Sequence, residues 1–259
     1  MAPRGVSRDL EQLAEGRPII TDAYHQVKAR LSELVEKMAD SGKLRLPSED
    51  QLGALLGVSR PTVRSALLSL QKEGKVQRLH GRGTFINKYA LRIRANVGED
   101  RPFLELLTRL GYTATLRTLS LRSVTLSGHI AERLEVNPDT EGCAIERLFE
   151  ADGRPAVLSV DYVPARLLNA PIDDVHPMNS TFEFLEVHTG HQVQYSVAEL
   201  IPVVPDETVA RHLNIDRQQA LLLMRHLHLN DDQRPVAVTE AHVNDAFLRF
   251  SVVRTYVGA

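Results

Sequence analysis

The sequence is poor in cysteine and in aromatic residues. Its 259 residues include one cysteine, no tryptophan and only 5% aromatic residues. A single cysteine, Cys143, excludes an intramolecular disulfide and fits a reducing compartment. The apolar neighbours Ala144 and Ile145 predict that Cys143 packs in a strand, so we do not expect it to act as a nucleophile.

A long apolar run is also lacking. No stretch of 18 apolar residues and no secretory signal pattern occurs, so we expect no transmembrane helix and no membrane partner. We expect a soluble, cytoplasmic protein. Apolar content of 43% and charged content of 25% are ordinary for a globular chain, and the length favours one or two domains.

The small net charge of −2 conceals an uneven distribution. Residues 1–94 contain 17 Lys+Arg and 10 Asp+Glu, whereas residues 95–259 contain 14 and 23. A basic first part joined to an acidic second part is typical of a nucleic-acid reader that carries a separate second domain.

Residues 46–86 form the most informative segment, because their pattern predicts two short helices and a hairpin. Ser48 and Gln51 have the spacing of a capping box, and Gly57 is suited to end the helix that the box begins. The expected apolar face of this helix comprises Leu52, Leu55 and Leu56.

A second helix is predicted to begin at Ser59, with Pro61 in its first turn and Gly74 at its end. Its expected buried face comprises Val63, Ala66, Leu67 and Leu70. Two helices joined by a short turn form a helix-turn-helix, whose second helix directs its N-terminal residues at base edges in the DNA major groove.

Arg60 and Arg64 are four residues apart, so they share the helix face opposite the buried one. Paired hydrogen bonds from Arg to guanine are the commonest specific base contact. The candidate DNA-binding residues of the two helices are Ser48, Ser59, Arg60, Thr62, Arg64 and Ser65.

Residues 76–86 predict a β-hairpin wing. Glycine lets the hairpin tip approach another backbone closely, and an arginine between two glycines is placed to meet phosphate or the minor groove. The candidate DNA-binding residues of the wing are His80, Gly81, Arg82, Gly83 and Thr84.

These motifs resemble the winged helix-turn-helix of the GntR family of bacterial transcription regulators. The matching residues are Leu46-Pro47-Ser48-Glu49, Val58-Ser59-Arg60, Thr62-Val63-Arg64, Ala66-Leu67, Gly74 and Gly81-Arg82-Gly83-Thr84-Phe85. The resemblance implies that Arg60 and Arg64 read bases and that the wing tip enters the minor groove. One departure is Asp50, because the family usually has a DNA-contacting arginine at that position.

We expect three segments: a DNA-binding domain at residues 19–88, which includes a helix at 20–41, a linker at 89–102 and a second domain at 103–259. Helices are predicted at 103–110, 127–136 and 206–215. Two similar hairpins, 145–164 and 223–243, each contain an Arg-Pro pair and each follow a helix. We therefore expect two helix–hairpin units that pair into one antiparallel sheet.

The second domain resembles the UTRA effector-binding domain found in the HutC branch of the GntR family. The resemblance rests on Leu110-Gly111-Tyr112, Ile145-Glu146-Arg147-Leu148, Asp152-Gly153-Arg154-Pro155, Tyr162-Val163-Pro164 and Arg234-Pro235-Val236. It implies a chorismate-lyase-like α/β fold with a central antiparallel sheet, which makes the whole chain α+β. It also implies a homodimer that binds a small intracellular metabolite.

The same resemblance suggests which residues form the effector site. Relatives that sense sugar phosphates commonly have a second arginine where this chain has Phe149, a hydroxyl residue where it has Arg101-Pro102 and a glutamate where it has Ala237. These departures argue against a sugar phosphate, though not against an anion. The candidate effector-binding residues are Arg147, Phe149, Ser159, Asp161, Tyr162 and Glu240.

Two acidic candidates have an alternative role. Asp161 and Glu240 lie in apolar strands, where they are expected either to meet a cationic or hydroxylated ligand or to pair with Arg147 and Arg225. His226 and His228 share a strand face, but no third metal ligand is apparent, so we expect no metal and no cofactor.

These patterns favour a ligand-responsive transcription regulator, most simply a repressor. A homodimer would present two DNA-binding domains to a double-stranded operator with an inverted repeat. One alternative is an enzyme that uses the lyase-like fold, although no nucleophile–base pair or phosphate loop is evident. Another is a DNA-binding scaffold whose second domain only dimerises.

Overall fold

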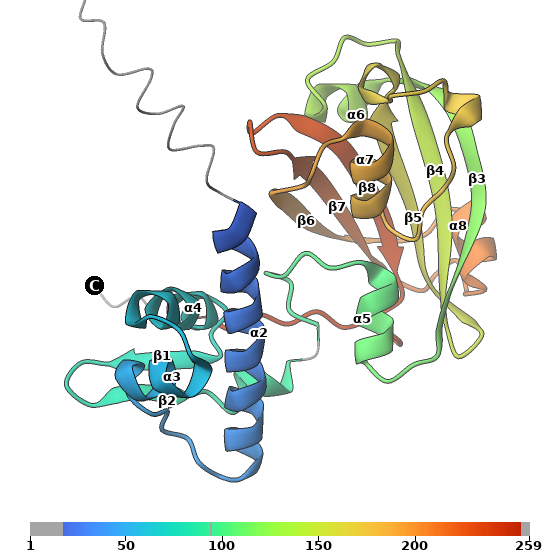
Figure 1. The fold of residues 1–259 in the computed structure, drawn as a ribbon. Helices are drawn as coiled ribbons and strands as arrows, with labels where there is room; N and C mark the ends of the chain where they lie inside the picture. Colours follow the sequence, from blue (N-terminus) through green and yellow to red (C-terminus); the bar gives the residue numbers. More distant parts are fainter. Residues whose placement is uncertain (1–17, 94, 255–259) are drawn as a thin grey trace, which may run out of the picture. The chain divides into compact units, whose positions relative to one another are not determined.

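The computed structural model describes residues 18–93 and 95–254, which divide into two compact units (Figure 1). Of the described residues, the head contains 18–93 and 252–254, and the sheet domain contains 95–251. The division falls inside the segment that we expected to be a linker. The second half of that segment joins the sheet domain, since Ala95 is buried in its core. Residues 255–259 of the expected second domain lie outside the described residues.

Three helices build the head: α2 (Pro18–Asp40), α3 (Glu49–Leu56) and α4 (Arg60–Lys72). Helix α4 begins at Ser59, whose hydroxyl accepts from the Thr62 amide, and Pro61 lies in its first turn as expected. The three helices and the wing share one apolar core of Val27, Leu31, Val35, Leu46, Leu52, Val63, Ala66, Leu67, Leu70, Val76 and Ile86.

Helix α3 has the predicted capping box. The Ser48 hydroxyl accepts from the Gln51 amide at 3.2 Å, and the Gln51 side chain accepts from the Ser48 amide at 2.9 Å. One residue of its expected apolar face was misplaced, because Leu55 is 64% exposed. The buried side of this short helix runs through Leu52 and Gly53, and Leu55 points away from it.

Gly53 permits the tight turn between α3 and α4. A Cβ atom built at this position would lie 3.0 Å from the Val58 carbonyl oxygen, which is closer than side chains normally approach backbone. The Gly53 carbonyl also accepts from the Val58 amide at 3.0 Å. The absence of a side chain therefore lets the turn fold back onto α3 and fixes the angle at which α4 leaves it.

The predicted wing is an antiparallel pair of β1 (Val76–Leu79) and β2 (Gly83–Ile86), followed by the 3-10 helix η1 (Ala90–Arg92). The segment before α3 pairs with β2 through an isolated antiparallel bridge between Arg45 and Phe85. In this bridge the Leu46 amide donates to the Thr84 carbonyl and the Ile86 amide donates to the Leu44 carbonyl. These bonds attach the wing to the helical core of the head.

The sheet domain contains one six-stranded antiparallel sheet with the order β3-β4-β5-β8-β7-β6. Its strands are β3 (Ala114–Leu126), β4 (Thr140–Ala151), β5 (Arg154–Pro164), β6 (Tyr195–Val203), β7 (Leu221–Leu229) and β8 (Pro235–Val243). Its helices are α5 (Phe103–Arg109), α6 (Gly128–Arg133), α7 (Thr181–Thr189) and α8 (Glu207–Leu213), with the 3-10 helices η2 (Ala165–Leu167) and η3 (Ile172–Asp174).

The element order repeats itself. The succession α5-β3-α6-β4-β5 is followed by α7-β6-α8-β7-β8, and the two halves meet where β5 pairs with β8. The two helix–hairpin units expected from the sequence therefore occur and pair as predicted. Each unit is longer than expected, because it begins with a further helix and strand.

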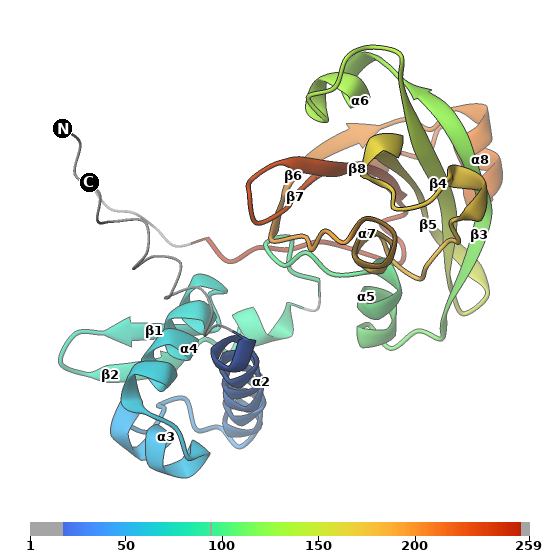
Figure 2. The ribbon, with the colours of Figure 1, turned by 45° about the horizontal axis from the view of Figure 1, so that its top comes forward.

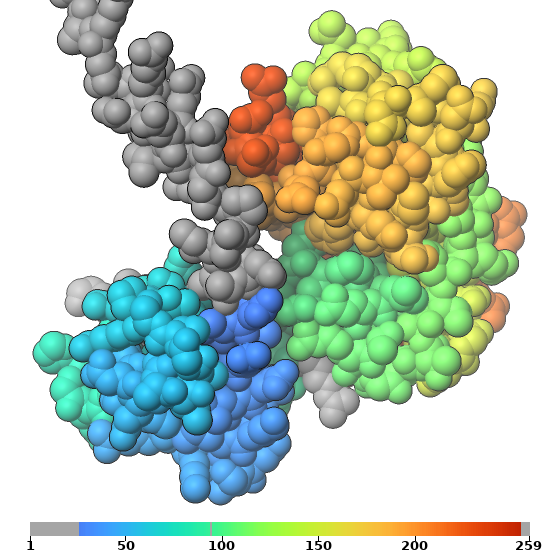
Figure 3. Space-filling view, viewed as in Figure 1, coloured from blue at the N-terminus to red at the C-terminus, as the bar shows by residue number. Residues whose placement is uncertain are grey.

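Helices cover both faces of the sheet (Figure 2). Helices α5 and α7 pack on the face that carries Ile145 and Met224, whereas α6 and α8 pack on the face that carries Leu158 and Val238. The yellow and orange atoms in Figure 3 belong to the segment around α7, which lies over the first face.

Among the described residues, no helix combines the length and the apolar character that crossing a membrane requires.

Candidate functional site

The N-terminal half of α4 presents polar side chains to solvent. Arg60, Arg64 and Ser65 are exposed, while Val63 and Ala66 on the opposite face are buried. The side chains of Arg60 and Arg64 therefore point away from the core, as the sequence predicted. Thr62 is half-buried, and its hydroxyl lies 2.8 Å from that of Ser59.

Arg60 is exposed but held by carboxylates at the start of α3. Its Nε atom donates to Glu49 Oε2 at 3.0 Å, and its Nη1 atom lies 3.5 Å from Asp50 Oδ1. Glu49 also pairs with Arg78 of the wing, with 3.3 Å between Oε1 and Nη2. Glu49 therefore ties the recognition helix to the wing, and the unusual Asp50 adds negative charge next to a candidate base-reading arginine.

The wing tip is a three-residue loop between the paired residues Leu79 and Gly83. Gly81 and Gly83 have φ angles of 70° and 103°, which side-chain-bearing residues rarely adopt. His80 and Arg82 are exposed at this tip and Thr84 is half-buried. The loop thus extends a basic side chain from the same unit that carries Arg64.

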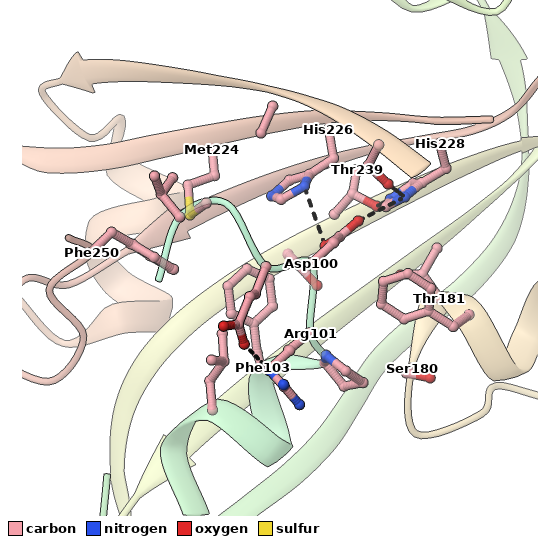
Figure 4. Close-up of a pocket in the computed structure, with 18 of the residues that line it drawn as sticks. Asp100, Arg101, Phe103, Ser180, Thr181, Met224, His226, His228, Thr239 and Phe250 are labelled. Atoms are coloured by element: carbon pink, nitrogen blue, oxygen red, sulfur yellow. Dashed lines mark hydrogen bonds and ion pairs between the residues drawn. The ribbon is translucent and has the colours of Figure 1, made fainter. Parts of the chain in front are cut away.

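The sheet domain contains a pocket of about 330 Å³ between α5, α7 and the sheet (Figure 4). One wall is apolar and consists of Phe103, Leu106, Phe149, Leu200, Met224 and Phe250, while the Phe182 ring lies next to His228, with 5.7 Å between the ring centres. The other wall is polar and consists of Asp100, Arg101, Asn179, Ser180, Thr181, Ser159, Ser196, His226, His228 and Thr239. Pockets that bind small molecules commonly have this size and this mixture.

A buried ion pair lies behind the polar wall. Arg147 is 1% exposed and its guanidinium bonds to Asp161, which is fully buried. Asp161 also accepts from Thr181 Oγ1 at 2.8 Å and from Thr239 Oγ1 at 2.6 Å. Arg147 and Asp161 therefore balance each other's charge, although Nη2 of Arg147 has no hydrogen-bond partner among the described residues. Burial lowers the pKa of Arg147 to about 10.

The hydrogen bonds around His228 fix its tautomer. Because Thr239 donates its proton to Asp161, His228 Nε2 must donate to Thr239 Oγ1, 2.9 Å away. The other ring atom, Nδ1, then accepts from Ser196 Oγ at 2.6 Å. This neutral imidazole is fully enclosed, and burial lowers its pKa to about 4.

Two predicted effector-binding residues, Tyr162 and Glu240, do not reach this pocket. Side chains alternate between the faces of a strand, so Tyr162 points away from the side of Asp161. Glu240 pairs with Arg225 at 2.8 Å and with His129 at 2.9 Å on that same far side. Of the other predicted residues, Phe149 and Ser159 line the pocket, whereas Arg147 and Asp161 lie behind it.

Comparisons with known proteins agree with both units. Residues 23–86 match the bacterial regulatory proteins of the gntR family, and residues 109–247 match the UTRA domain. The HTH-type transcriptional regulator RB1450 of Rhizobium meliloti is 31% identical over 186 residues, which cover 69% of each chain. This chain belongs to the GntR family and carries a UTRA domain.

Two further relatives are more distant. The mannosyl-D-glycerate transport/metabolism system repressor MngR of Escherichia coli is 25% identical, over 77% of this chain and 82% of its own. The transcriptional regulator YydK of Bacillus subtilis has a TM-score of 0.71 at 16% identity, over 90% of this chain and 99% of its own, which shows a shared fold. Proteins of this family regulate transcription and are not enzymes.

Reasoning from sequence missed the residues that give the UTRA pocket its charge. Asp100 was assigned to the linker, yet its carboxylate lies 3.7 Å from Nδ1 of both His226 and His228 (Figure 4). The two imidazoles are parallel and 5.7 Å apart. No local pattern marks Asp100, since the chain brings it to β7 only through the tertiary fold.

These three groups do not form a metal site. Within residues 18–93 and 95–254, no three His, Cys, Asp or Glu side chains are placed to hold a metal ion. We therefore interpret the pocket through hydrogen bonds and charge.

Proposed function

We propose that this protein is a repressor of the HutC branch that binds a specific operator as a homodimer in the bacterial cytoplasm. In this proposal, α4 of each head enters a major groove and the wing contacts the neighbouring backbone. The observation that carries it is the outward placement of Arg64 on α4, whose opposite face is buried in the core of a GntR head. The residues proposed to contact DNA are Ser48, Ser59, Arg60, Thr62, Arg64, Ser65, His80, Gly81, Arg82, Gly83 and Thr84.

We further propose that a small molecule in the UTRA pocket controls operator affinity. The pocket has the volume of a metabolite site, and its lining includes residues 97–102, which directly follow the boundary between the two units. A ligand that orders this segment would alter the freedom of the attached head. Coupling of this kind typically amounts to about 1–3 kcal/mol, or roughly 5–150-fold in affinity.

The operator can be identified without knowledge of the regulated genes. Full-length protein is used to enrich binding sequences from random duplex DNA, and affinity is then measured by fluorescence anisotropy against a scrambled duplex at fixed salt. We expect an enriched inverted repeat bound by one protein dimer, with the stoichiometry measured by analytical ultracentrifugation. If no sequence were enriched, the proposal that the protein binds a specific operator would be wrong.

Effector control is tested on the same complex. Fractions of a bacterial metabolite extract are added to the protein–operator complex, and we expect one fraction to release DNA. The control variant Met224→Trp fills the apolar wall of the pocket, so it should bind the operator normally but no longer respond. If no fraction changes operator affinity, the UTRA domain serves only as a scaffold.

A further inference from the structure

The charges around the UTRA pocket leave one carboxylate unbalanced. Three charged residues line the pocket: Glu99, Asp100 and Arg101. The Arg101 guanidinium donates to Glu99 at 2.8 Å and to Glu105 at 2.7 Å, so two carboxylates already surround it. Among the described residues, no lysine or arginine lies within 4.0 Å of the Asp100 carboxylate.

The histidines beside Asp100 do not neutralise it. His228 is held in a neutral form whose Nδ1 atom accepts a hydrogen bond from the Ser196 hydroxyl, so that atom carries no proton to donate to Asp100. His226 is 8% exposed, and neither of its ring nitrogens has a hydrogen-bond partner. Burial lowers the pKa of His226, which favours the neutral imidazole at neutral pH.

The start of α7 offers an anion few side-chain donors. The Ser180 hydroxyl accepts from the Glu183 amide, and the Glu183 carboxylate accepts from the Asn179 amide at 3.1 Å. The Thr181 hydroxyl donates to Asp161. The Asn179 and Glu183 amides and the Thr181 hydroxyl are thus already bonded to oxygen atoms of the protein, and the Glu183 carboxylate adds negative charge at this helix end.

The opposite wall of the pocket is built from aromatic rings and a thioether. The ring centres of Phe103 and Phe149 are 5.5 Å apart, and Phe250 and Met224 continue the same surface (Figure 4). Aromatic faces attract cations and also pack against apolar groups. A ligand that combines a positive nitrogen with an apolar body would therefore complement both walls.

We propose that the effector carries a cationic nitrogen, such as an ammonium or a guanidinium group, which binds the Asp100 carboxylate and donates to the unpartnered imidazole of His226. The apolar part of the effector packs between Phe103, Phe149 and Met224. This inference rests on the proposed effector control of the UTRA domain and specifies its ligand class. Because Asp100 lies in the segment that leads to the head, the same contact would connect ligand binding to the DNA-binding unit.

The test compares three probes of one shape at pH 8: 2-phenylethylamine, phenylacetate and 2-phenylethanol, which are cationic, anionic and neutral. Binding to the full-length protein is measured by isothermal titration calorimetry. We expect the amine to bind at least about tenfold more tightly than the other two, because a charged hydrogen bond is typically worth about 1.5–3 kcal/mol. Glucose 6-phosphate and zinc chloride serve as additional probes.

Three variants distinguish binding in the pocket from a general effect of charge. Asp100→Asn keeps the size of the side chain but removes its charge, so it should weaken amine binding at least about tenfold. Asp232→Asn makes the same chemical change in the exposed β7–β8 turn and should leave amine binding unchanged. His226→Leu should weaken amine binding by a smaller factor, since it removes one neutral acceptor.

The outcomes distinguish this inference from the function on which it rests. Tighter binding of phenylacetate, 2-phenylethanol, glucose 6-phosphate or zinc, lost in Met224→Trp, would overturn the cationic ligand while supporting an effector pocket. Equal loss of amine binding in Asp100→Asn and Asp232→Asn would also overturn it. Absence of binding by every probe would count against the inference alone, because release of operator DNA by metabolite fractions is measured independently of ligand charge.

Discussion

In the head, Arg64 projects from α4 into solvent, whereas in the UTRA domain Arg147 lies enclosed by the sheet and bonds to Asp161. Both arginines were candidates for ligand contact in the sequence. The N–H donors of an exposed guanidinium group are hydrated when no DNA is bound, so an unoccupied Arg64 costs the protein little stability. A buried guanidinium must be compensated inside the protein, because removing an unpaired charge from water costs several kcal/mol.

This difference in burial explains why Arg64 is free to contact DNA, whereas Arg147 supports the polar wall of the UTRA pocket. Arg147 donates to Asp161 and, through Nε, to the Met178 carbonyl at 3.1 Å. Asp161 in turn orders Thr181 and Thr239, which line the pocket. Arg147 therefore acts on the pocket by positioning its polar wall, although its own side chain does not line it.

The strongest way to test this contrast is to remove Arg147. In Arg147→Ala the Asp161 carboxylate would remain buried without its cation, so we expect the UTRA domain to lose about 3–5 kcal/mol of stability. The loss is measured by urea unfolding followed by circular dichroism. Arg225→Ala is the matched control, because Arg225 pairs with Glu240 at a partly exposed site and should contribute about 1 kcal/mol or less.

A double variant separates lost charge from lost packing. Arg147→Met combined with Asp161→Asn removes both charges and keeps much of the volume, so it should recover at least half of the lost stability. If the single and double variants were equally unstable, the cavity left by the arginine would be the cause. Buried charge would then have no special role in this wall.

The exposed arginine should show the opposite behaviour. Arg64→Ala is expected to leave unfolding nearly unchanged but to cost about 1–3 kcal/mol in operator binding, with a smaller loss on scrambled DNA. Lys72→Ala, at the far end of the same helix, controls for a general loss of positive charge. If anisotropy showed equal losses of affinity for operator and scrambled duplexes, Arg64 would contact only the phosphates and would not read a base.

The head was predictable because its signals are local. The capping box at Ser48, the cap at Ser59 and the apolar spacing of α4 each operate within about one helical turn, and all three occur as expected. Leu55 was misjudged because a helix of eight residues has too few apolar positions to define its buried side. That side was set by Gly53, whose lack of a side chain allows the close turn.

The UTRA pocket was harder to predict because it depends on strand register. The sequence identified β4, β5, β7 and β8, but the face of each residue follows from alternation, and an error of one position moves a side chain to the other face. This is why Asp161 lies behind the pocket wall while Tyr162 lies on the far side. Helix α7 was missed, although Ser180 and Glu183 have the spacing of a capping box.

Burial also makes the UTRA pocket sensitive to pH. The pKa of His228 falls to about 4 in the folded protein, below its usual 6.5, so the unfolded chain binds more protons between these values. Stability should be complete above pH 6.5 and decline as pH falls, by about 1–2 kcal/mol at pH 5 from this group. His228→Gln should flatten the decline between pH 6.5 and pH 5 in urea unfolding, whereas the exposed His80→Gln should not.

The smallest expected effect concerns Asp50, which forms an exposed ion pair with Arg60 and can be compared with the buried pair of Arg147 and Asp161. Its carboxylate lies 3.5 Å from Arg60, but both side chains are well exposed, so water screens the attraction and the pair adds little to stability. Asp50→Asn should leave stability unchanged and increase DNA affinity by up to about fivefold, because less negative charge faces the phosphates.

Repeating the anisotropy titrations between 50 and 200 mM salt distinguishes two causes of this gain in affinity. If the gain shrinks as salt rises, Asp50 acts through repulsion of the backbone, whereas a gain confined to some operator sequences would show that freeing Arg60 changes base recognition.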